Sequence, residues 1–256
     1  MSNLQVDRDG GLMTVTFSRP EKKNALTQAM YQAAHEAIEA GRADPAVRVI
    51  VLTGAGEAFT AGNDVIDFMS KLPKKAEDSP TVRFMRSVFE CEKPLIAAVN
   101  GVAVGVGVTM LLHCDLVYVA AGSQLKMPFT KLALCPELVS SYLLPRMIGM
   151  PRAMEMLLLG DAISAERAVE WGLANEVLAA EAVLPRALER ARQIAALPPG
   201  SVRDTKRLMR APWRDLGDQV FWDELTTLSA RLGSPEVSEA VTAFFQKREP
   251  DFSRFA

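Results

Sequence analysis

The sequence predicts an α/β protein, and two patterns along the chain point to this class. In the first half of the 256 residues, short apolar runs typical of buried strands alternate with apolar residues at helical spacing. From about residue 150, the strand patterns end and residues that favour helix starts take over. Strands interleaved with helices favour a layered α/β domain, and the C-terminal third is expected to be helical.

The predicted strands are short apolar segments. In residues 12–17, Met13, Val15 and Phe17 alternate with Leu12 and two threonines. Residues 47–54 and 93–101 are short apolar runs that end in glycine, as buried strands often do. Between the first two strands, apolar residues at helical spacing predict a helix over 25–40, with Gly41 as its stop. The four predicted strands are 12–17, 47–54, 93–101 and 115–120.

Proline and hydroxyl residues predict where the C-terminal helices begin. Ser201 with Asp204 resembles a capping box, and Ser234 followed by Pro235 is typical of a cap and a first turn. Residues 71–80, charged and flanked by prolines, are expected to form a mobile surface segment, either beside a binding cleft or as a plain solvated loop. The expected helix starts are Pro151, Ser164, Ser201 and Ser234.

Composition excludes several classes of function. The formal net charge is -2 and Lys and Arg are scattered, so nothing indicates a surface for nucleic acid or for an anionic membrane. Three cysteines are too few and too widely spaced for a disulfide framework or a zinc site, and their odd number fits a reducing cytosol. The N-terminus is polar and no apolar run approaches the roughly 18 residues of a membrane span, so a cytoplasmic location is expected.

Two glycine-rich segments, 56–68 and 99–111, are each expected to lead from a buried strand into a helix, the first opening near Asp64. Such a turn exposes backbone N–H groups that suit a phosphate or a developing oxyanion. Close helix packing explains Gly105 and Gly107 equally well. Two such turns about 40 residues apart could instead aim one N–H each at a single oxygen, which is the geometry of an oxyanion hole.

Glu137 is the single carboxylate in residues 127–146. Together with Pro136 it could open a helix, because a fixed φ and a negative charge both suit a first turn. By elimination it is also the best candidate acid or base. Apolar neighbours such as Phe129 and Leu138 could exclude water and raise its basicity.

The other side chains with useful chemistry are expected to be structural. His35 is expected on the surface, and His113 is expected to pack at the end of an apolar helix. A nucleophilic role for Cys135 or Ser140 has no evident histidine partner to support it.

Six ordered motifs run over nearly the whole chain: RPEKKNAL (19–26), GEAFTAGND (56–64), KPLIAAVNGVAVGVG (93–107), CDLVYV (114–119), AERAVEWGLANEV (165–177) and FFQKREPDF (244–252). Together they resemble the motifs of the crotonase, or enoyl-CoA hydratase/isomerase, superfamily. The resemblance implies a crotonase-like superhelix of repeated ββα turns over residues 1–195. It also implies a helical C-terminal trimerisation region over 196–256, in a homotrimer or a dimer of trimers.

The resemblance further implies a binding site. The backbone N–H groups of Asn63 and Val106 would form the oxyanion hole and grip the thioester carbonyl of an acyl-CoA. Lysines suit phosphates as point charges, although a solvated surface explains either of the two lysines near residue 22 equally well. The implied substrate- and CoA-binding residues are Lys22 or Lys23, Ala25, Ala61, Gly62, Asp64, Gly105, Phe129 and Lys247. Because CoA is part of the substrate, no cofactor and no metal is implied.

Departures from the family pattern narrow the expected reaction. Family hydratases hold a water between two glutamates, and those positions are Thr109 and Phe129 here. The stretch PFTKLALCPELVSS and the GND of the first turn instead resemble Δ3,Δ2-enoyl-CoA isomerases, in which the glutamate of this motif is the single base. This branch implies that Glu137 removes a proton from C2 of a 3-enoyl-CoA and returns it to C4 through an oxyanion-stabilised dienolate. Two alternatives stay open: a family hydratase or thioester hydrolase that uses Glu137, and a non-catalytic acyl-CoA-binding protein.

Overall fold

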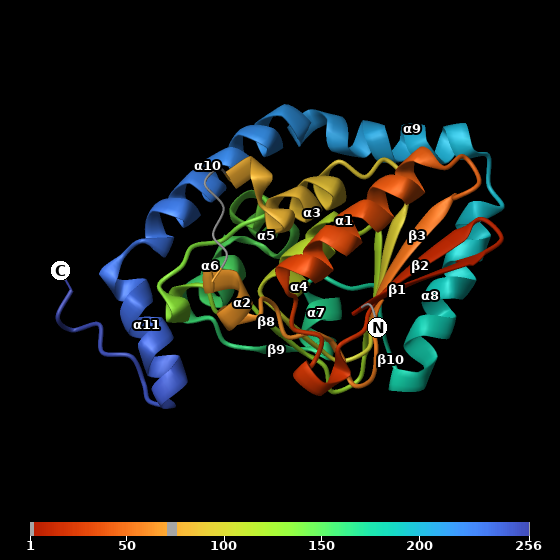
Figure 1. The fold of residues 1–256 in the computed structure, drawn as a ribbon. Helices are drawn as coiled ribbons and strands as arrows, with labels where there is room; N and C mark the ends of the chain where they lie inside the picture. Colours follow the sequence, from red (N-terminus) through yellow and green to blue (C-terminus); the bar gives the residue numbers. More distant parts are fainter. Residues whose placement is uncertain (1–2, 71–75, 256) are drawn as a thin grey trace.

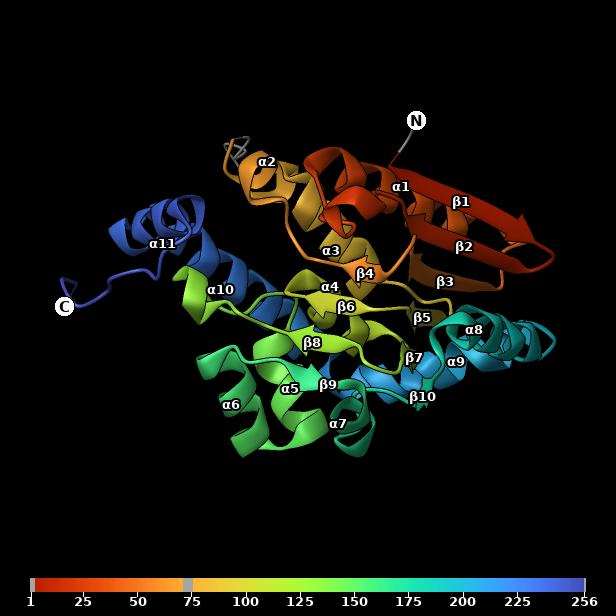
Figure 2. The same ribbon diagram turned by 90° about the horizontal axis from the view of Figure 1, so that it is seen from below.

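The computed structural model describes residues 3–70 and 76–255 and has the expected α/β architecture. Its strands are β1 (Leu4–Asp9), β2 (Leu12–Phe17), β3 (Val49–Gly54), β4 (Ala58–Thr60), β5 (Leu95–Val99), β6 (Val102–Val104), β7 (Leu116–Ala120), β8 (Gln124–Lys126), β9 (Ile163–Ser164) and β10 (Glu176–Leu178). Within the described ranges they form a six-stranded sheet, in the order β1-β2-β3-β5-β7-β10, and a four-stranded sheet, in the order β4-β6-β8-β9 (Figures 1 and 2).

Helices surround the two sheets. The α-helices of the described residues are α1 (Gln28–Ala43), α2 (Val65–Ser70), α3 (Pro80–Phe89), α4 (Val106–Thr109), α5 (Ser140–Ile148), α6 (Met150–Leu159), α7 (Ala165–Glu170), α8 (Ala180–Ala195), α9 (Pro199–Arg210), α10 (Arg214–Leu232) and α11 (Pro235–Gln246). The short 3-10 helices are η1 (Pro20–Lys22), η2 (Ala76–Asp78), η3 (Met110–His113), η4 (Thr130–Leu132) and η5 (Ala211–Trp213). α1 and α3 pack together on one side of the large sheet, and α8 packs on the other (Figures 1 and 2).

The two faces of β3 explain this layering. Side chains alternate along a strand, so Ile50 and Leu52 enter the core that α1 and α3 share, whereas Val49 and Val51 pack against α8. All four side chains are fully buried. A parallel strand covered on both faces is expected to be apolar along its whole length, as this one is.

Strands of the large sheet lead into short strands of the small one. β3 is followed by β4, β5 by β6 and β7 by β8, and a helix follows each pair. This is the repeated ββα unit that the family resemblance implies. β4 and β6 are parallel neighbours, with Ala58 opposite Val102, so their carboxyl ends lie at the same edge of the sheet. The loops that follow β4 and β6 therefore lie side by side.

The structure differs from the sequence expectations at both edges of the large sheet. β1 is not among the predicted strands, because it is exposed along most of its length and lacks an apolar pattern. β10 lies in the part expected to be helical, and it is only three residues long. β9 also lies there and pairs with β8. The expectation that strands end near residue 150 is therefore wrong.

The predicted stop of the first helix is also wrong. α1 begins after Thr27, whose hydroxyl accepts a hydrogen bond from the N–H three residues on, and it continues through Gly41. A Cβ at Gly41 would lie 2.4 Å from Cε of Met13. Close packing against β2, rather than helix termination, therefore explains this glycine.

Most of the predicted C-terminal helix starts are confirmed. The hydroxyls of Ser164 and Ser234 each accept a hydrogen bond from a backbone N–H of the first turn. The capping box at Ser201 is wrong, because α9 already begins at Pro199 and Ser201 lies inside its first turn. The confirmed starts are Pro151, Ser164 and Ser234.

The helices after residue 195 are joined to the core. Phe221 of α10 is fully buried, with its ring centroid 5.9 Å from that of Phe89. Lys206 of α9 is buried as well and donates to the carbonyl of Lys93 at 2.7 Å and to the carboxylate of Asp115 at 2.6 Å. The division at residue 195 and the oligomerisation role of 196–256 stay predictions.

Part of the predicted mobile segment, 71–75, lies outside the described residues, and the remainder forms η2 and the start of α3. Within the described ranges, no helix is long and apolar enough to cross a membrane. The same ranges contain no group of three or more His, Cys, Asp or Glu side chains placed to hold a metal ion.

Candidate active site

The loops after β4 and β6 meet at their glycines. Gly62 has a φ of 83°, and a Cβ there would lie 2.8 Å from the carbonyl oxygen of Val104. Gly107 is packed as closely, since a Cβ would lie 2.6 Å from Cγ2 of Thr60. Gly105 is different, because nothing lies within 4 Å of an added Cβ, while its φ of 56° and ψ of -118° disfavour any side chain. Close packing thus explains Gly107, and a backbone conformation explains Gly105.

Each loop carries a backbone N–H group that no described residue accepts. Leu26 donates to the carbonyl of Gly62 at 2.8 Å and accepts from the N–H of Asp64 at 2.9 Å. Because these bonds flank Asn63, its own N–H points to the opposite side of the chain. Val106 is the first residue of α4, so its N–H has no acceptor within the helix. Two donors therefore lie on neighbouring loops, as an oxyanion hole requires.

Tyr31 of α1 connects the first loop to the core. Its hydroxyl donates a hydrogen bond to the side-chain oxygen of Asn63, and only 1% of its surface is exposed. Burial raises the pKa of Tyr31 well above its usual range, and the charge of Glu137 raises it further. The phenol therefore stays protonated, and Glu137 lies close enough to influence it.

Glu137 lies in the loop between η4 and α5, with 3% of its surface exposed. Oγ1 of Thr109 donates to its Oε1 at 2.6 Å, whereas Oε2 has no hydrogen-bond partner among the described residues. Thr109 is the last residue of α4, and Val106 is the first, so Glu137 contacts the helix that follows the second loop. The prediction that Pro136 and Glu137 open a helix is wrong, because α5 begins only at Ser140.

The surroundings of Glu137 make it a stronger base than an ordinary glutamate. Burial raises its pKa from 4.5 to about 8, the hydrogen bond from Thr109 opposes that rise, and the charge of Glu224 adds to it. The expected apolar neighbours, Phe129 and Leu138, are both buried. A carboxylate with this pKa accepts a proton from carbon more readily than one at the usual value.

The backbone beside Glu137 is strained. Leu138 and Val139 have φ values of 56° and 61°, in the left-handed region that non-glycine residues rarely adopt. Each such residue costs about 1–3 kcal/mol, so the surrounding structure must hold it. Nε2 of His113 donates to the carbonyl of Leu138 at 2.8 Å, and burial lowers the pKa of His113 to about 3, which keeps the ring neutral. His113 is therefore buried as expected, and it also supports the loop.

Three other polar residues were expected to be structural. His35 is half-buried on α1, so it lies only partly at the surface. Burial raises the pKa of the Cys135 thiol, which makes the thiol a poorer nucleophile. Ser140 is fully buried, and its N–H donates to the carbonyl of Glu137 at 3.1 Å.

Most of the predicted CoA-binding residues come together beside the first loop. Residues 23–26 run next to 60–64, joined by a hydrogen bond of 2.9 Å from the N–H of Ala61 to the carbonyl of Lys23. The side chains of Lys22 and Lys23 are both exposed. The residues brought together are Lys22, Lys23, Ala25, Ala61, Gly62 and Asp64.

Sequence reasoning missed Arg19 and Asn24, which hold this region together. Arg19 donates to the carboxylate of Asp64 at 2.7 Å and to the carbonyl of Ala25 at 3.1 Å, and its hydrogen bond lowers the pKa of Asp64. The Asn24 amide is fully buried and donates to the carbonyl of Ala58 at 2.7 Å. Both residues belong to the RPEKKNAL motif, but Asp64 and Ala58 are distant from it in sequence.

Of the three other predicted binding residues, Gly105 lies in the second loop, whereas Phe129 and Lys247 lie in other segments. Phe129 is buried in the main core, just before η4. Lys247 is exposed at the end of α11, at the opposite end of the molecule from β1 and α8 (Figure 2). Within the part of the chain that the structure describes, no hydrogen bond or ion pair joins Lys247 to the other predicted binding residues. A role for Lys247 in binding CoA stays a prediction.

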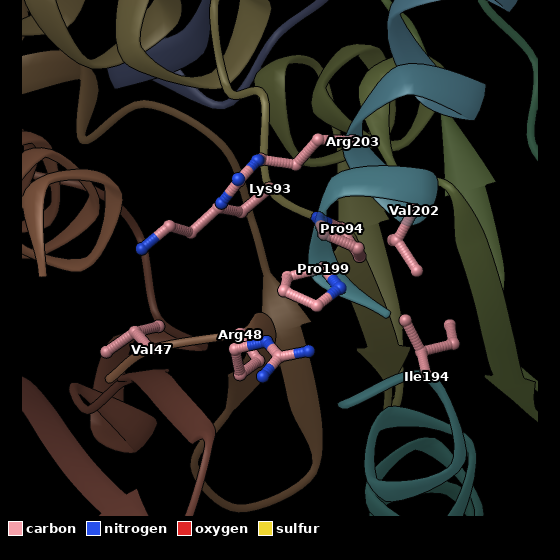
Figure 3. A pocket seen from close by; sticks show the side chains of 8 residues that line it. All are labelled: Val47, Arg48, Lys93, Pro94, Ile194, Pro199, Val202 and Arg203. Atoms are coloured by element: carbon pink, nitrogen blue, oxygen red, sulfur yellow. The ribbon is translucent and has the colours of Figure 1, made fainter. Parts of the chain in front are cut away.

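Figure 3 shows a cavity that is separate from this site. Its volume of about 10 Å³ has room for about one water, and its lining holds no carboxylate. It lies where β3 and β5 begin, whereas the two loops of the candidate site follow β4 and β6. The lining residues are Val47, Arg48, Lys93, Pro94, Ile194, Pro199, Val202 and Arg203.

Comparisons with known proteins show the family of this chain. Residues 7–254 match the family model described as Enoyl-CoA hydratase/isomerase. The chain is 37% identical over 250 residues to Enoyl-CoA delta isomerase 2 of Rattus norvegicus, covering 96% of this chain and 64% of that protein. It therefore spans less than two thirds of the rat protein. It is 36% identical to 1,2-epoxyphenylacetyl-CoA isomerase of Escherichia coli (strain K12), over 95% of each chain.

One solved structure shows the similarity of the fold. The crystal structure of an enoyl-CoA hydratase/isomerase from Pseudoalteromonas atlantica T6c matches with a TM-score of 0.94 and 38% identity. The match covers 98% of this chain and 99% of that chain. The two folds are therefore alike over almost their whole length.

Proposed function

We propose that this chain, which belongs to the enoyl-CoA hydratase/isomerase (crotonase) family, is an isomerase that moves the double bond of a 3-enoyl-CoA to the 2-position. The observation that carries the proposal is a buried carboxylate, Glu137, with one oxygen held by Thr109 and the other unpartnered among the described residues. Two relatives named as isomerases of CoA compounds support the same class of reaction.

The N–H groups of Asn63 and Val106 are proposed to bind the thioester oxygen of the substrate. When C2 loses a proton, negative charge spreads onto this oxygen. Two donors already fixed in place stabilise that charge without reorganising during the reaction. The hydrogen bond from Tyr31 to the Asn63 side chain supports the proposal by fixing the residue that carries the first donor.

Glu137 is proposed to carry the proton in both steps. Its Oε2 removes a proton from C2, and the electron pair of the broken C–H bond forms a dienolate with the double bond and the thioester. The same carboxyl then returns the proton to C4, which leaves the double bond between C2 and C3. Burial supports this role because a proton held away from water exchanges slowly between the two steps.

A hydratase mechanism has less support, because it needs a second available acid or base. Another buried carboxylate beside the loop is Glu224, but its oxygens already accept hydrogen bonds from Val139 and Ser141. Thr109 and Phe129 occupy the positions at which the family resemblance places the hydratase glutamates. A hydrolase that uses Glu137 to direct water is kept as an outcome of the test.

The remaining proposals concern the rest of the substrate and the assembly. Residues 22–25 and 61–64 are proposed to hold the CoA portion, with Lys22 or Lys23 at its phosphates. Lys247 is proposed to reach CoA as well.

We also propose a homotrimer or a dimer of trimers in the cytoplasm, with no role for nucleic acid or a membrane. Proton transfer with oxyanion stabilisation covers this chemistry, so the proposal includes no metal or cofactor.

The test follows the ultraviolet absorbance of the conjugated 2-enoyl thioester after a 3-enoyl-CoA is mixed with the protein. We expect turnover in the wild type and a loss of about 10²–10⁴-fold in Glu137→Gln, because the amide cannot accept the proton. Acyl-CoA affinity should change little, and Glu181→Gln, a matched change at an exposed glutamate, should leave turnover intact. By mass, a hydroxyacyl-CoA would indicate a hydratase and free CoA a hydrolase. Binding without turnover would indicate a binding protein.

A further inference from the structure

We infer that α10 is a positioning element for Glu137, because Glu224 and Arg231 bind the two ends of the loop 133–139 that carries it, Glu224 at the junction with α5. The inference rests on the proposed function, in which Glu137 is the base. No sequence pattern indicates this connection, since 85 residues separate Glu224 from Val139.

Glu224 binds the C-terminal end of the loop. Its carboxylate is buried and accepts hydrogen bonds from the N–H of Val139 at 2.6 Å, the N–H of Ser141 at 2.8 Å and Oγ of Ser141 at 2.5 Å. Burial raises the pKa of Glu224, and these hydrogen bonds oppose that rise because they favour its ionised form. Because both oxygens are engaged, the side chain has one orientation, and it fixes the backbone immediately after Glu137.

Arg231 binds the N-terminal end of the loop. Its Nε donates to the carbonyl of Ala133 at 2.6 Å, and Ala133 has a φ of 57°. Glu224 and Arg231 are seven residues apart, so they lie on the same face of α10, about 10 Å apart along its axis. The loop is therefore attached to one helix face at two points, with Glu137 between them.

The strain in this loop explains why it needs such support. Ala133, Leu138 and Val139 all have left-handed φ values, which persist only where the surroundings hold them. Without Glu224, the N–H of Val139 would lose its buried acceptor and the loop would relax. A misplacement of about 1 Å at a reacting group can cost about 10²-fold in rate. Loss of Glu224 should therefore move Oε2 of Glu137 away from the reacting carbon.

Glu224 also acts on Glu137 through its charge. That charge raises the pKa of Glu137, although burial is the larger cause. Tyr31 and Cys135 stay protonated and His113 stays neutral, so they add no charge near pH 7. The titratable and charged groups around the pair are Cys135 of the loop, Tyr31 of α1, His113 of η3 and Arg231 of α10.

Glu224→Gln tests the inference, because it keeps the shape but removes the charge and one of the two acceptor oxygens. We expect kcat to fall by about 10–10²-fold with KM within about twofold, and the acid limb of kcat/KM to move to lower pH. Asp218→Asn is the matched control, since this carboxylate on the same helix pairs with Arg86 instead of the loop. Wild-type kcat and an unmoved limb in Glu224→Gln, or the same changes in the control, would overturn the inference.

Two milder variants test the positioning role of α10 if Glu224→Gln does not fold. Ser141→Ala removes one hydroxyl from the contact, and Arg231→Met removes the bond to Ala133. Each should lower kcat severalfold with little change in KM. Glu236→Gln is the control for the arginine, because it removes the ion-pair partner of Arg231 and leaves its Nε bond to the loop. Wild-type kcat in both Ser141→Ala and Arg231→Met contradicts a positioning role.

An infrared titration separates failure of this inference from failure of the proposed function. The C=O band of protonated Glu137, assigned by its absence in Glu137→Gln, reports the pKa of this carboxyl without any turnover. If the wild type does not isomerise a 3-enoyl-CoA but Glu224→Gln moves the midpoint of the band to lower pH, the proposed function fails and the coupling of α10 to Glu137 stands. An unmoved midpoint in an active enzyme overturns the inference alone.

Discussion

The two sides of the candidate site are held in different ways. The loops after β4 and β6 are shaped by their own backbone, since Gly62 packs on the carbonyl of Val104 and Gly105 has a conformation that disfavours side chains. The loop around Glu137 is shaped by side chains from distant parts of the chain. These side chains are Thr109, His113 and Glu224. The half proposed to bind the oxyanion is thus built into the sheet, whereas the properties of Glu137, the proposed base, depend on its neighbours.

The largest expected effect concerns the base and the pH dependence of stability. The pKa of Glu137 is about 8 in the folded protein and 4.5 as an ordinary glutamate. A raised carboxyl pKa contributes stability that is fully present below the unfolded value and is lost as pH rises through the folded value. Between pH 4.5 and about 8, the free energy of unfolding of Glu137→Gln should rise relative to that of the wild type by up to about 1.4 kcal/mol for each pH unit. Urea unfolding across that range measures the gain, and a constant difference between the two proteins would show that the pKa is not raised.

A second prediction tests whether the backbone itself shapes the loops after β4 and β6. Gly62→Ala should destabilise the protein by about 2–3 kcal/mol, because it combines a positive φ with a clash against Val104. Gly105→Ala meets open space, so only its conformation opposes the side chain and about 1–2 kcal/mol is expected. Gly200→Ala in α9 has neither problem and serves as the control. Equal denaturation midpoints for all three variants would remove the distinction between the two sides.

A third prediction sharpens the account of the base. Thr109→Val keeps the shape of the side chain but removes the hydrogen bond to Glu137, a bond that lowers the pKa of this carboxyl. The acid limb of kcat/KM should therefore move to higher pH, by about one unit or less for a bond of ordinary strength. A pH-rate profile measures the shift. Movement to lower pH would contradict the contact, as would no movement.

The smallest expected effect lies in the region proposed to bind CoA. Nη1 of Arg19 donates to both Asp64 and Ala25, and Arg19→Lys should weaken this contact because a compact, more strongly hydrated ammonium replaces the planar guanidinium. We expect KM for an acyl-CoA to rise by about 2–5-fold, with kcat nearly unchanged, as suits a partly exposed ion pair. Steady-state kinetics would count against this role if kcat fell and KM did not change.

The same contrast explains how much could be predicted from the sequence. The glycine turns were visible because glycine itself marks the unusual backbone, and Glu137 was visible because it stood alone among apolar residues. The packing role of Gly41 was not visible, since it depends on Met13 from a neighbouring strand. Glu224 looks like any helical glutamate, and only the fold brings it to Val139. Contacts between distant segments are therefore what the sequence left undetermined.

The sequence predictions failed at the edges of the large sheet for a different reason. β1 is too exposed and β10 too short to carry an apolar pattern of their own, so pairing with β2 and β7 is what makes them strands. The ββα repeat was expected from the resemblance of motifs, and the ordered pairs from β3 to β8 confirm it. Local patterns predict the central strands well, and the edges depend on the assembled sheet.

The central claim is that one buried carboxyl carries the proton from C2 to C4. The most direct test gives the protein a 3-enoyl-CoA with deuterium at C2 and locates the deuterium in the product by NMR and mass. The account predicts an isomer of unchanged composition with deuterium delivered to C4, and no such product in Glu137→Gln. A hydrated product, released CoA, or an isomer whose new C4 hydrogen comes entirely from solvent would contradict it.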